Sequence, residues 1–137
     1  MTPVLDASVF IAAISPVERH YARARQLFDS HPDSAPFLVP DLFRLEVSAA
    51  LARRGESAEF LDVVDALVRG PRFFQCPLDE ALLEVAVRVA RDARLAAYDA
   101  VYVALALVRD APLFTLDAEV ASRTQGRFPD LAVIGAD

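Results

Sequence analysis

Short apolar runs alternate with longer segments of helical periodicity along the sequence, and this alternation limits the folds that the chain can adopt. The apolar runs cover residues 3–6, 37–40, 72–76, 113–116 and 131–135. Helical patterns cover residues 7–14, about 18–30, 41–54, 57–68, 78 to about 92, 97–108 and 118–123. Strands separated by helices favour a parallel sheet covered on both faces. We therefore predict a three-layer α/β/α fold around a short, mostly parallel five-stranded sheet.

Length and composition indicate one compact domain spanning residues 1–137. The chain has 137 residues, 55% of them hydrophobic, which supports a substantial core. Its one cysteine, Cys76, cannot form an intramolecular disulfide, so a reducing compartment is expected. No apolar run reaches the ~20 residues of a membrane span, and Asp6 interrupts the apolar start of the chain. We expect a cytoplasmic protein with no membrane association.

The sequence lacks residues that several nucleotide-binding and phosphoacceptor domains need. All 14 basic residues are arginines, and a P-loop needs a lysine, as does the strand end of a receiver domain. No G-x-G-x-x-G motif marks a dinucleotide site. The net charge of −6 disfavours nucleic acid as a partner, yet a local basic patch can coexist with an acidic total. Such a patch is suggested by the early arginines: Arg19, Arg23, Arg25, Arg44, Arg53 and Arg54.

Two acids stand at predicted strand ends. Asp6 closes the first apolar run and Asp117 follows the fourth. Carboxyl ends of parallel strands meet at one edge of a sheet, where sites form in this class of fold. Either aspartate could instead cap the helix that follows it.

Two further acids interrupt apolar helices. Asp99 lies within "LAAYDAVYVALAL", where its one-turn neighbours are apolar, and a buried carboxylate there is costly unless a partner meets it. A buried arginine or a capping role would be the structural explanation. Glu46 lies in "LFRLEVSAAL", where it could instead share a narrow solvent-facing stripe with Arg53.

Taken together, these motifs resemble one family. "YDAVYVALA" followed by "LFTLD", with "VLDASV" near the start and "LAVIG" at the end, resembles the PIN-domain nucleases, and more narrowly the VapC-type toxins of bacterial toxin–antitoxin pairs. The resemblance implies a PIN-like fold with Asp6, Glu46, Asp99 and Asp117 as the catalytic, metal-binding acids. Asp41 is the nearest alternative to Glu46, although helix capping explains it. Ser8 and Thr115 take the hydroxyl positions that support the acids.

The resemblance also implies an activity. We expect an endoribonuclease that uses Mg²⁺, or Mn²⁺, and cuts single-stranded or looped RNA to a 5′-phosphate and a 3′-hydroxyl. Carboxylates and waters are the ligands that Mg²⁺ prefers. Arg19, Arg23 and Arg44 are candidates to hold RNA phosphates beside the acids.

The expected partners are an antitoxin protein and a second copy of the chain.

Two other functions compete with this interpretation of the sequence. A phosphatase-like site is disfavoured because "DAS" supplies one acid where D-x-D is needed. A PIN fold that only binds RNA or protein remains the alternative from a different class. The sequence does not reveal the RNA target, the antitoxin or the number of metal ions.

Overall fold

The computed structural model describes residues 2–136, and within them seven helices accompany a five-stranded sheet. The strands are β1 (Val4–Leu5), β2 (Phe37–Pro40), β3 (Phe73–Cys76), β4 (Leu113–Phe114) and β5 (Val133–Ile134). The helices are α1 (Ala7–Ala13), α2 (Tyr21–Asp29), α3 (Leu42–Arg53), α4 (Ala58–Val68), α5 (Glu80–Ala93), α6 (Ala97–Arg109) and α7 (Ala118–Thr124). The predicted α/β fold is confirmed.

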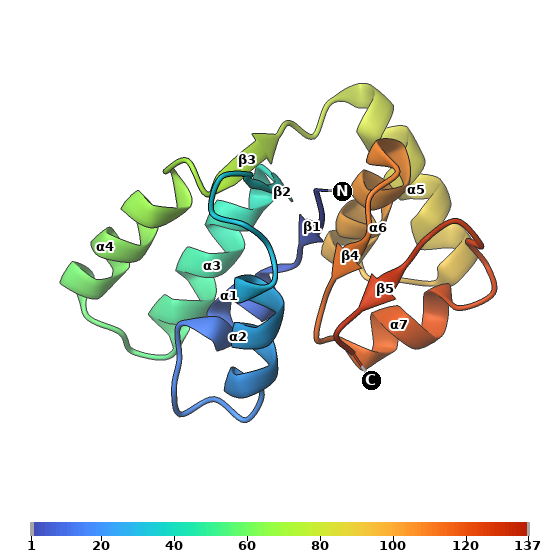
Figure 1. Ribbon diagram of the computed structural model, residues 1–137. Coiled ribbons are helices and arrows are strands. Elements are labelled where there is room, and N and C mark those ends of the chain that lie inside the picture. The colour runs from blue at the N-terminus through green and yellow to red at the C-terminus, as the bar shows by residue number, and fades with distance from the viewer. Residues whose placement is uncertain (1, 137) are drawn as a thin grey trace.

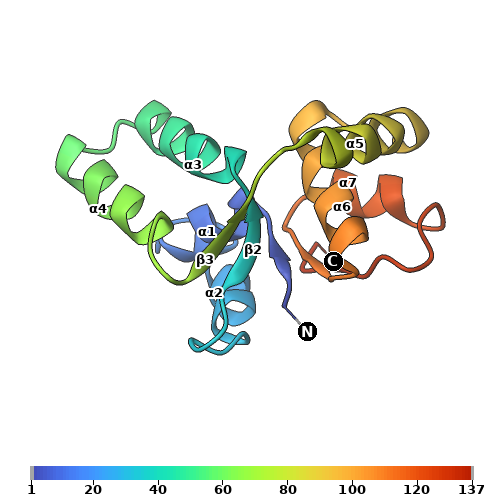
Figure 2. The ribbon, with the colours of Figure 1, turned by 90° about the horizontal axis from the view of Figure 1, so that it is seen from above.

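The strands lie in the order β3-β2-β1-β4-β5, and every neighbouring pair is parallel. The sheet is therefore wholly parallel rather than mostly parallel. Figure 1 and Figure 2 show α1–α4 gathered on one side of the strands and α5–α7 on the other. The chain runs from β1 outward to β3, then crosses to the opposite side of β1 to form β4. The strand order thus reverses between β1 and β4, which is where ligand sites form in open α/β sheets.

The two faces of the sheet are buried by different side chains. On the α1–α3 side, Phe10 packs against Phe28, Phe43 and Phe73, with ring centroids 6.1, 5.8 and 5.2 Å away. On the other side, α6 contributes Tyr102 and other fully buried residues and packs against β1, β2 and β4. Strands covered in this way are almost wholly apolar, as expected for a parallel sheet.

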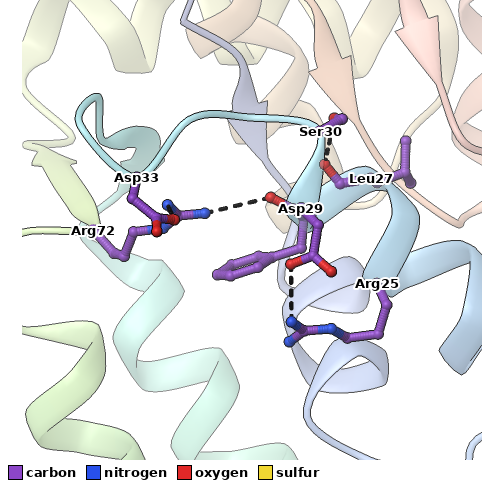
Figure 3. A network of polar contacts seen from close by, with 7 residues as sticks. Arg25, Leu27, Asp29, Ser30, Asp33 and Arg72 are labelled. Carbon is purple, nitrogen blue, oxygen red and sulfur yellow. Dashed lines mark hydrogen bonds and ion pairs between the residues drawn. The ribbon is translucent and has the colours of Figure 1, made fainter.

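A polar network connects the N-terminus of β3 to the C-terminus of α2 (Figure 3). The Arg72 guanidinium binds Asp33, donates to the Phe28 carbonyl at 3.3 Å and stacks on the Phe28 and Phe37 rings. Arg25 pairs with Asp29 one turn away at 2.8 Å. Since the strands are parallel, this network lies at the end of the sheet opposite to the strand-end acids.

Three local expectations need correction. The second helix begins at Tyr21 rather than near residue 18, because the backbone from Ser15 to Tyr21 forms successive turns. The fifth helix begins at Glu80, since Asp79 caps it by accepting from the Leu82 amide at 2.8 Å. The Asp41 side chain makes no capping bond to α3 and instead accepts from the Leu78 amide at 3.3 Å. Within residues 2–136, no helix has the length and apolar character needed to cross a membrane.

Candidate active site

The register of β1 and β4 brings two strand ends together. Leu5 pairs with Phe114, and the Asp6 amide donates to the Phe114 carbonyl at 2.9 Å. Asp6 and the segment that follows Phe114 therefore leave the sheet side by side, at the point where the strand order reverses. This edge is the one expected from the sequence for Asp6 and Asp117.

Two hydroxyl groups fix the Asp6 carboxylate. Ser8 Oγ and Thr115 Oγ1 both donate to Asp6 Oδ2, each at 2.7 Å. Asp6 stands at the N-terminus of α1 but makes no side-chain capping bond. Capping therefore does not explain an acid that is only 8% exposed. The hydroxyls are fixed in turn, because Ser8 Oγ accepts from the Leu116 amide at 3.2 Å.

Asp117 does cap a helix. Its Oδ1 accepts from the Glu119 and Val120 amides at the start of α7, at 2.9 and 3.4 Å. Its own amide donates to Thr115 Oγ1 at 3.1 Å. Thr115 thus connects Asp117 to Asp6, and the capping bonds hold Asp117 in place through one carboxylate oxygen.

The four predicted acids line one pocket. A cavity of about 460 Å³ is bounded by Asp6, Glu46, Asp99 and Asp117, together with Ser8. Glu46 reaches it from the middle of α3, and Asp99 from the first turn of α6, where the helix dipole favours negative charge. Asp99 is half-buried and forms no ion pair with an arginine among residues 2–136. A buried structural salt bridge therefore does not account for it.

The electrostatics of the pocket disfavour negative charge. Burial raises the pKa of Asp6 above its ordinary value, against the opposing effect of the Thr115 and Ser8 hydroxyls. Burial, with the nearby Asp6 and Asp99, raises the pKa of Glu46 to about 7. Burial, with Asp117 and Asp6, raises the pKa of Asp99 to about 6. Several carboxyl groups held together in this way are stabilised by a cation.

Tyr102 lies beneath the acids. It is 2% exposed, and its hydroxyl makes no hydrogen bond of normal geometry with any residue from 2 to 136. Glu46 Oε1 is likewise buried without such a bond, although the neighbouring phenol lowers the pKa of Glu46. The pocket thus holds a buried carboxylate whose neighbouring donor, the Tyr102 phenol, does not reach normal hydrogen-bond geometry.

These groups fit a hydrated hard cation. Within residues 2–136, no three His, Cys, Asp or Glu side chains are close enough to bind one ion together directly. Mg²⁺ does not require this, because it usually keeps several waters and takes one or two carboxylates. An all-oxygen set of four carboxyl groups, one with an unpartnered oxygen, is the donor chemistry that such an ion prefers.

The three arginines expected to hold RNA lie elsewhere. Arg44 binds Asp65 through two hydrogen bonds of 2.7 and 2.9 Å and lines a neighbouring hollow. Arg23 lines a larger cavity of about 730 Å³ beside α7 and β5. Arg19 is exposed in the connection before α2. None of the three is among the residues that line the acid pocket.

The sequence does not assign two residues of the pocket wall to the site, although Arg53 is among the early arginines and shares a predicted helix stripe with Glu46. Arg53, at the end of α3, and Tyr98, immediately before Asp99, both line the cavity with the acids. The seven-residue spacing from Glu46 to Arg53 was the available signal, because it places both side chains on one helix face.

A family profile for the PIN domain matches residues 4–126. The chain belongs to the PIN domain family. The matched region contains all four acids and both hydroxyl residues of the pocket. PIN-family nucleases generally use divalent metal ions, in keeping with an all-carboxylate donor set.

Solved structures of similar fold include proteins of toxin–antitoxin systems. This PIN domain resembles Mycobacterium tuberculosis VapC20, a sarcin-ricin loop cleaving toxin (TM-score 0.74, 19% identity, 88% of this chain and 94% of that chain). A toxin–antitoxin complex from Klebsiella pneumoniae gives a TM-score of 0.71 at 16% identity, covering 96% of each chain. PAE2754 from Pyrobaculum aerophilum gives 0.61 at 25% identity, covering 92% of this chain and 88% of that one. No curated protein sequence matches the chain significantly.

Proposed function

We propose that this PIN domain is a metal-dependent endoribonuclease and the toxin of a toxin–antitoxin pair. One observation carries the proposal: Asp6, Glu46, Asp99 and Asp117 line a single pocket where the strand order reverses. Support also comes from the similarity to VapC20, a sarcin-ricin loop cleaving toxin.

Each acid has a defined task in this proposal. Asp6 and Asp99 would hold Mg²⁺ or Mn²⁺ directly or through water, and Glu46 and Asp117 would orient the surrounding waters. The bound ion would supply Lewis acidity, activating water and neutralising charge on the phosphoryl group. Ser8 and Thr115 keep the Asp6 carboxylate in one orientation, and losing such supporting hydrogen bonds typically costs about 10–100-fold in metal affinity or activity. Glu46, with a pKa of about 7, is able to accept a proton near neutral pH.

The comparisons with solved structures support one of the proposed partners, the antitoxin. The Klebsiella pneumoniae structure contains a toxin with its antitoxin, and we propose a cognate antitoxin for this chain as well. We also propose that the chain forms a homodimer and meets its RNA in the cytoplasm as a single domain of residues 1–137.

The test is RNA cleavage by the purified chain with Mg²⁺, with Mn²⁺ and in EDTA. Cleavage should require the ion and leave 5′-phosphate ends. Asp99→Asn should lower the rate by more than about 100-fold, because losing a metal-binding group costs more than losing its support. Asp92→Asn, at an exposed acid of α5 outside the pocket, is the matched control and should cleave like the parent.

Equal cleavage in EDTA, or full activity of Asp99→Asn, would contradict the proposal. RNA binding without cleavage in either ion would instead favour the alternative of an inactive PIN fold that only binds RNA.

A further inference from the structure

The wall of the acid pocket carries an arginine and exposed apolar side chains that the proposed chemistry does not use. Arg53 and Leu45 come from α3, and Tyr98 comes from α6, in the two helix groups seen in Figure 2. Tyr98 is 52% exposed and Leu45 is 62% exposed. A large aromatic side chain kept in water beside a reaction pocket has surface available for a flat ligand.

The face of α3 that lines the pocket extends away from the acids, from Glu46 to Arg53. Glu46, Ala49, Ala50 and Arg53 follow a spacing of three, four and seven residues and all line the cavity. Arg53 lies two helical turns beyond Glu46, about 10 Å along the axis. The small alanines between them leave room for a chain to lie along the helix. The guanidinium is therefore placed for a phosphate next to the one that the acids surround.

Arg53 differs from the arginines around it. Arg44 is bound to Asp65, and Arg54 pairs with Glu18 at 3.3 Å. The Arg53 side chain makes no hydrogen bond or ion pair with any residue from 2 to 136, although acids line the same pocket. Its guanidinium is available to bind a phosphate through parallel N–H donors.

We infer that Arg53 and Tyr98 form a subsite for one unpaired nucleotide that flanks the scissile bond, Arg53 binding its phosphate and Tyr98 stacking on its base. The inference rests on the proposed function for the identity of the polymer. A base can lie against an aromatic ring only when it is unstacked from its neighbours, so this subsite selects single-stranded or looped RNA over a duplex. The pocket of about 460 Å³ has the size of a small-ligand site, which suits one nucleotide.

Binding of a labelled, uncleavable single-stranded RNA analogue and of its duplex, measured by fluorescence anisotropy with Mg²⁺ present, tests the subsite, because the ion offsets the repulsion between the acids and the RNA phosphates. Tyr98→Ala should weaken single-strand binding by about 10-fold or more, and Tyr98→Phe should retain it. Arg53→Gln should weaken binding and lower the slope of log affinity against log salt by about one. Phe74→Ala, at another exposed aromatic residue, and Arg54→Gln are the matched controls and should bind like the parent. Thermal melts should show all variants folded.

Three results would overturn the subsite: no binding by the parent, equal affinity for duplex and single strand, or unchanged binding by both Tyr98→Ala and Arg53→Gln. The last result would favour a partner protein as the ligand of the exposed Tyr98 and Leu45 side chains. Cleavage assays separate this outcome from failure of the proposed function. A parent that cleaves RNA while both variants bind normally removes only the subsite. If the parent binds single-stranded RNA but never cleaves it, and both variants lose that binding, the subsite stands and only the proposed nuclease activity is refuted.

Discussion

The Asp6 carboxylate is subject to two opposing influences. Burial raises its pKa, while two hydroxyl donors on the same oxygen favour the charged form. A residue used only to cap α1 would need neither the burial nor these donors. The arrangement suits a carboxylate that must stay oriented while it binds a cation.

Replacing Thr115 with valine tests this orientation. Thr115→Val keeps the shape but removes one donor to Asp6 and the acceptor of the Asp117 amide. We expect RNA cleavage or metal affinity to fall by about 10–100-fold, because supporting hydrogen bonds of metal-binding groups have effects of this size. Thr124→Val is the matched control, since Thr124 is equally buried but bonds only within α7. It should cost about 1 kcal/mol of stability and leave cleavage unchanged. Equal activity losses in the two variants would remove the special role of Thr115.

Glu46 makes stability depend on pH in the absence of metal. Its pKa is about 7 in the folded chain against an ordinary 4.5, so the folded state binds more protons between these values. Its contribution to the free energy of unfolding is fully present below 4.5 and is lost as the pH rises through about 7. We expect the difference in melting temperature between Glu46→Gln and the parent, in EDTA, to be larger at pH ~8 than at pH ~5. A difference that is constant with pH would show that Glu46 titrates normally.

The acids of the pocket could be predicted from the sequence, whereas its basic and aromatic residues could not. Asp6, Asp99 and Asp117 stand out because their neighbours are apolar. Arg44 and Arg53 lie on the same helix, α3, and only the position of Asp65 on α4 shows that Arg44 is paired. Tyr98 reads as one more apolar residue of its helix until its exposure is known.

At the scale of elements, strand and helix identities followed from periodicity, while boundaries depended on tertiary hydrogen bonds. The sequence pattern at 113–116 predicted a strand through Leu116, but regular pairing ends at Phe114. Beyond this point the Thr115 amide still donates to the Ile134 carbonyl at 3.0 Å, while the Thr115 hydroxyl and the Leu116 amide donate to the Asp6 and Ser8 side chains. A contact between residues more than 100 positions apart leaves no local signal in the sequence.

Gly135 couples β5 to this part of the site. Its φ of +117° and the 2.6 Å from an added Cβ to the Thr115 carbonyl oxygen leave no space for a side chain. We expect Gly135→Ala to destabilise the fold by about 1–3 kcal/mol more than Gly126→Ala, measured by urea unfolding. Gly126 also has positive φ, +77°, but its Cβ position is open, so it isolates backbone strain from crowding. An equal loss of unfolding free energy in the two variants would show that β5 shifts to accommodate the new side chain without disturbing Thr115.

At the scale of the whole molecule, the alternation of strands and helices predicted the parallel sheet. Parallel topology alone then placed Asp6 and Asp117 at one edge. The approach of α3 and α6 to that edge could not be derived in the same way, because helix packing depends on side-chain shape across the core. The apolar neighbours of Asp99 single it out within its helix, whereas Glu46 is assigned through the family resemblance, and the structure places both in the pocket.

The central claim is that four acids share a pocket built for a metal ion, and thermal melts of the parent and Asp99→Asn test it most directly. Mutual repulsion and burial, which raise the pKa of Asp99 to about 6, should destabilise the metal-free fold. Asp99→Asn removes one charge with little change of shape. We expect it to melt higher than the parent in EDTA and to gain less stability from added Mg²⁺ or Mn²⁺. The exposed control Asp92→Asn should match the parent in both conditions. A lower melting temperature of Asp99→Asn in EDTA, with an unchanged response to metal, would contradict the claim.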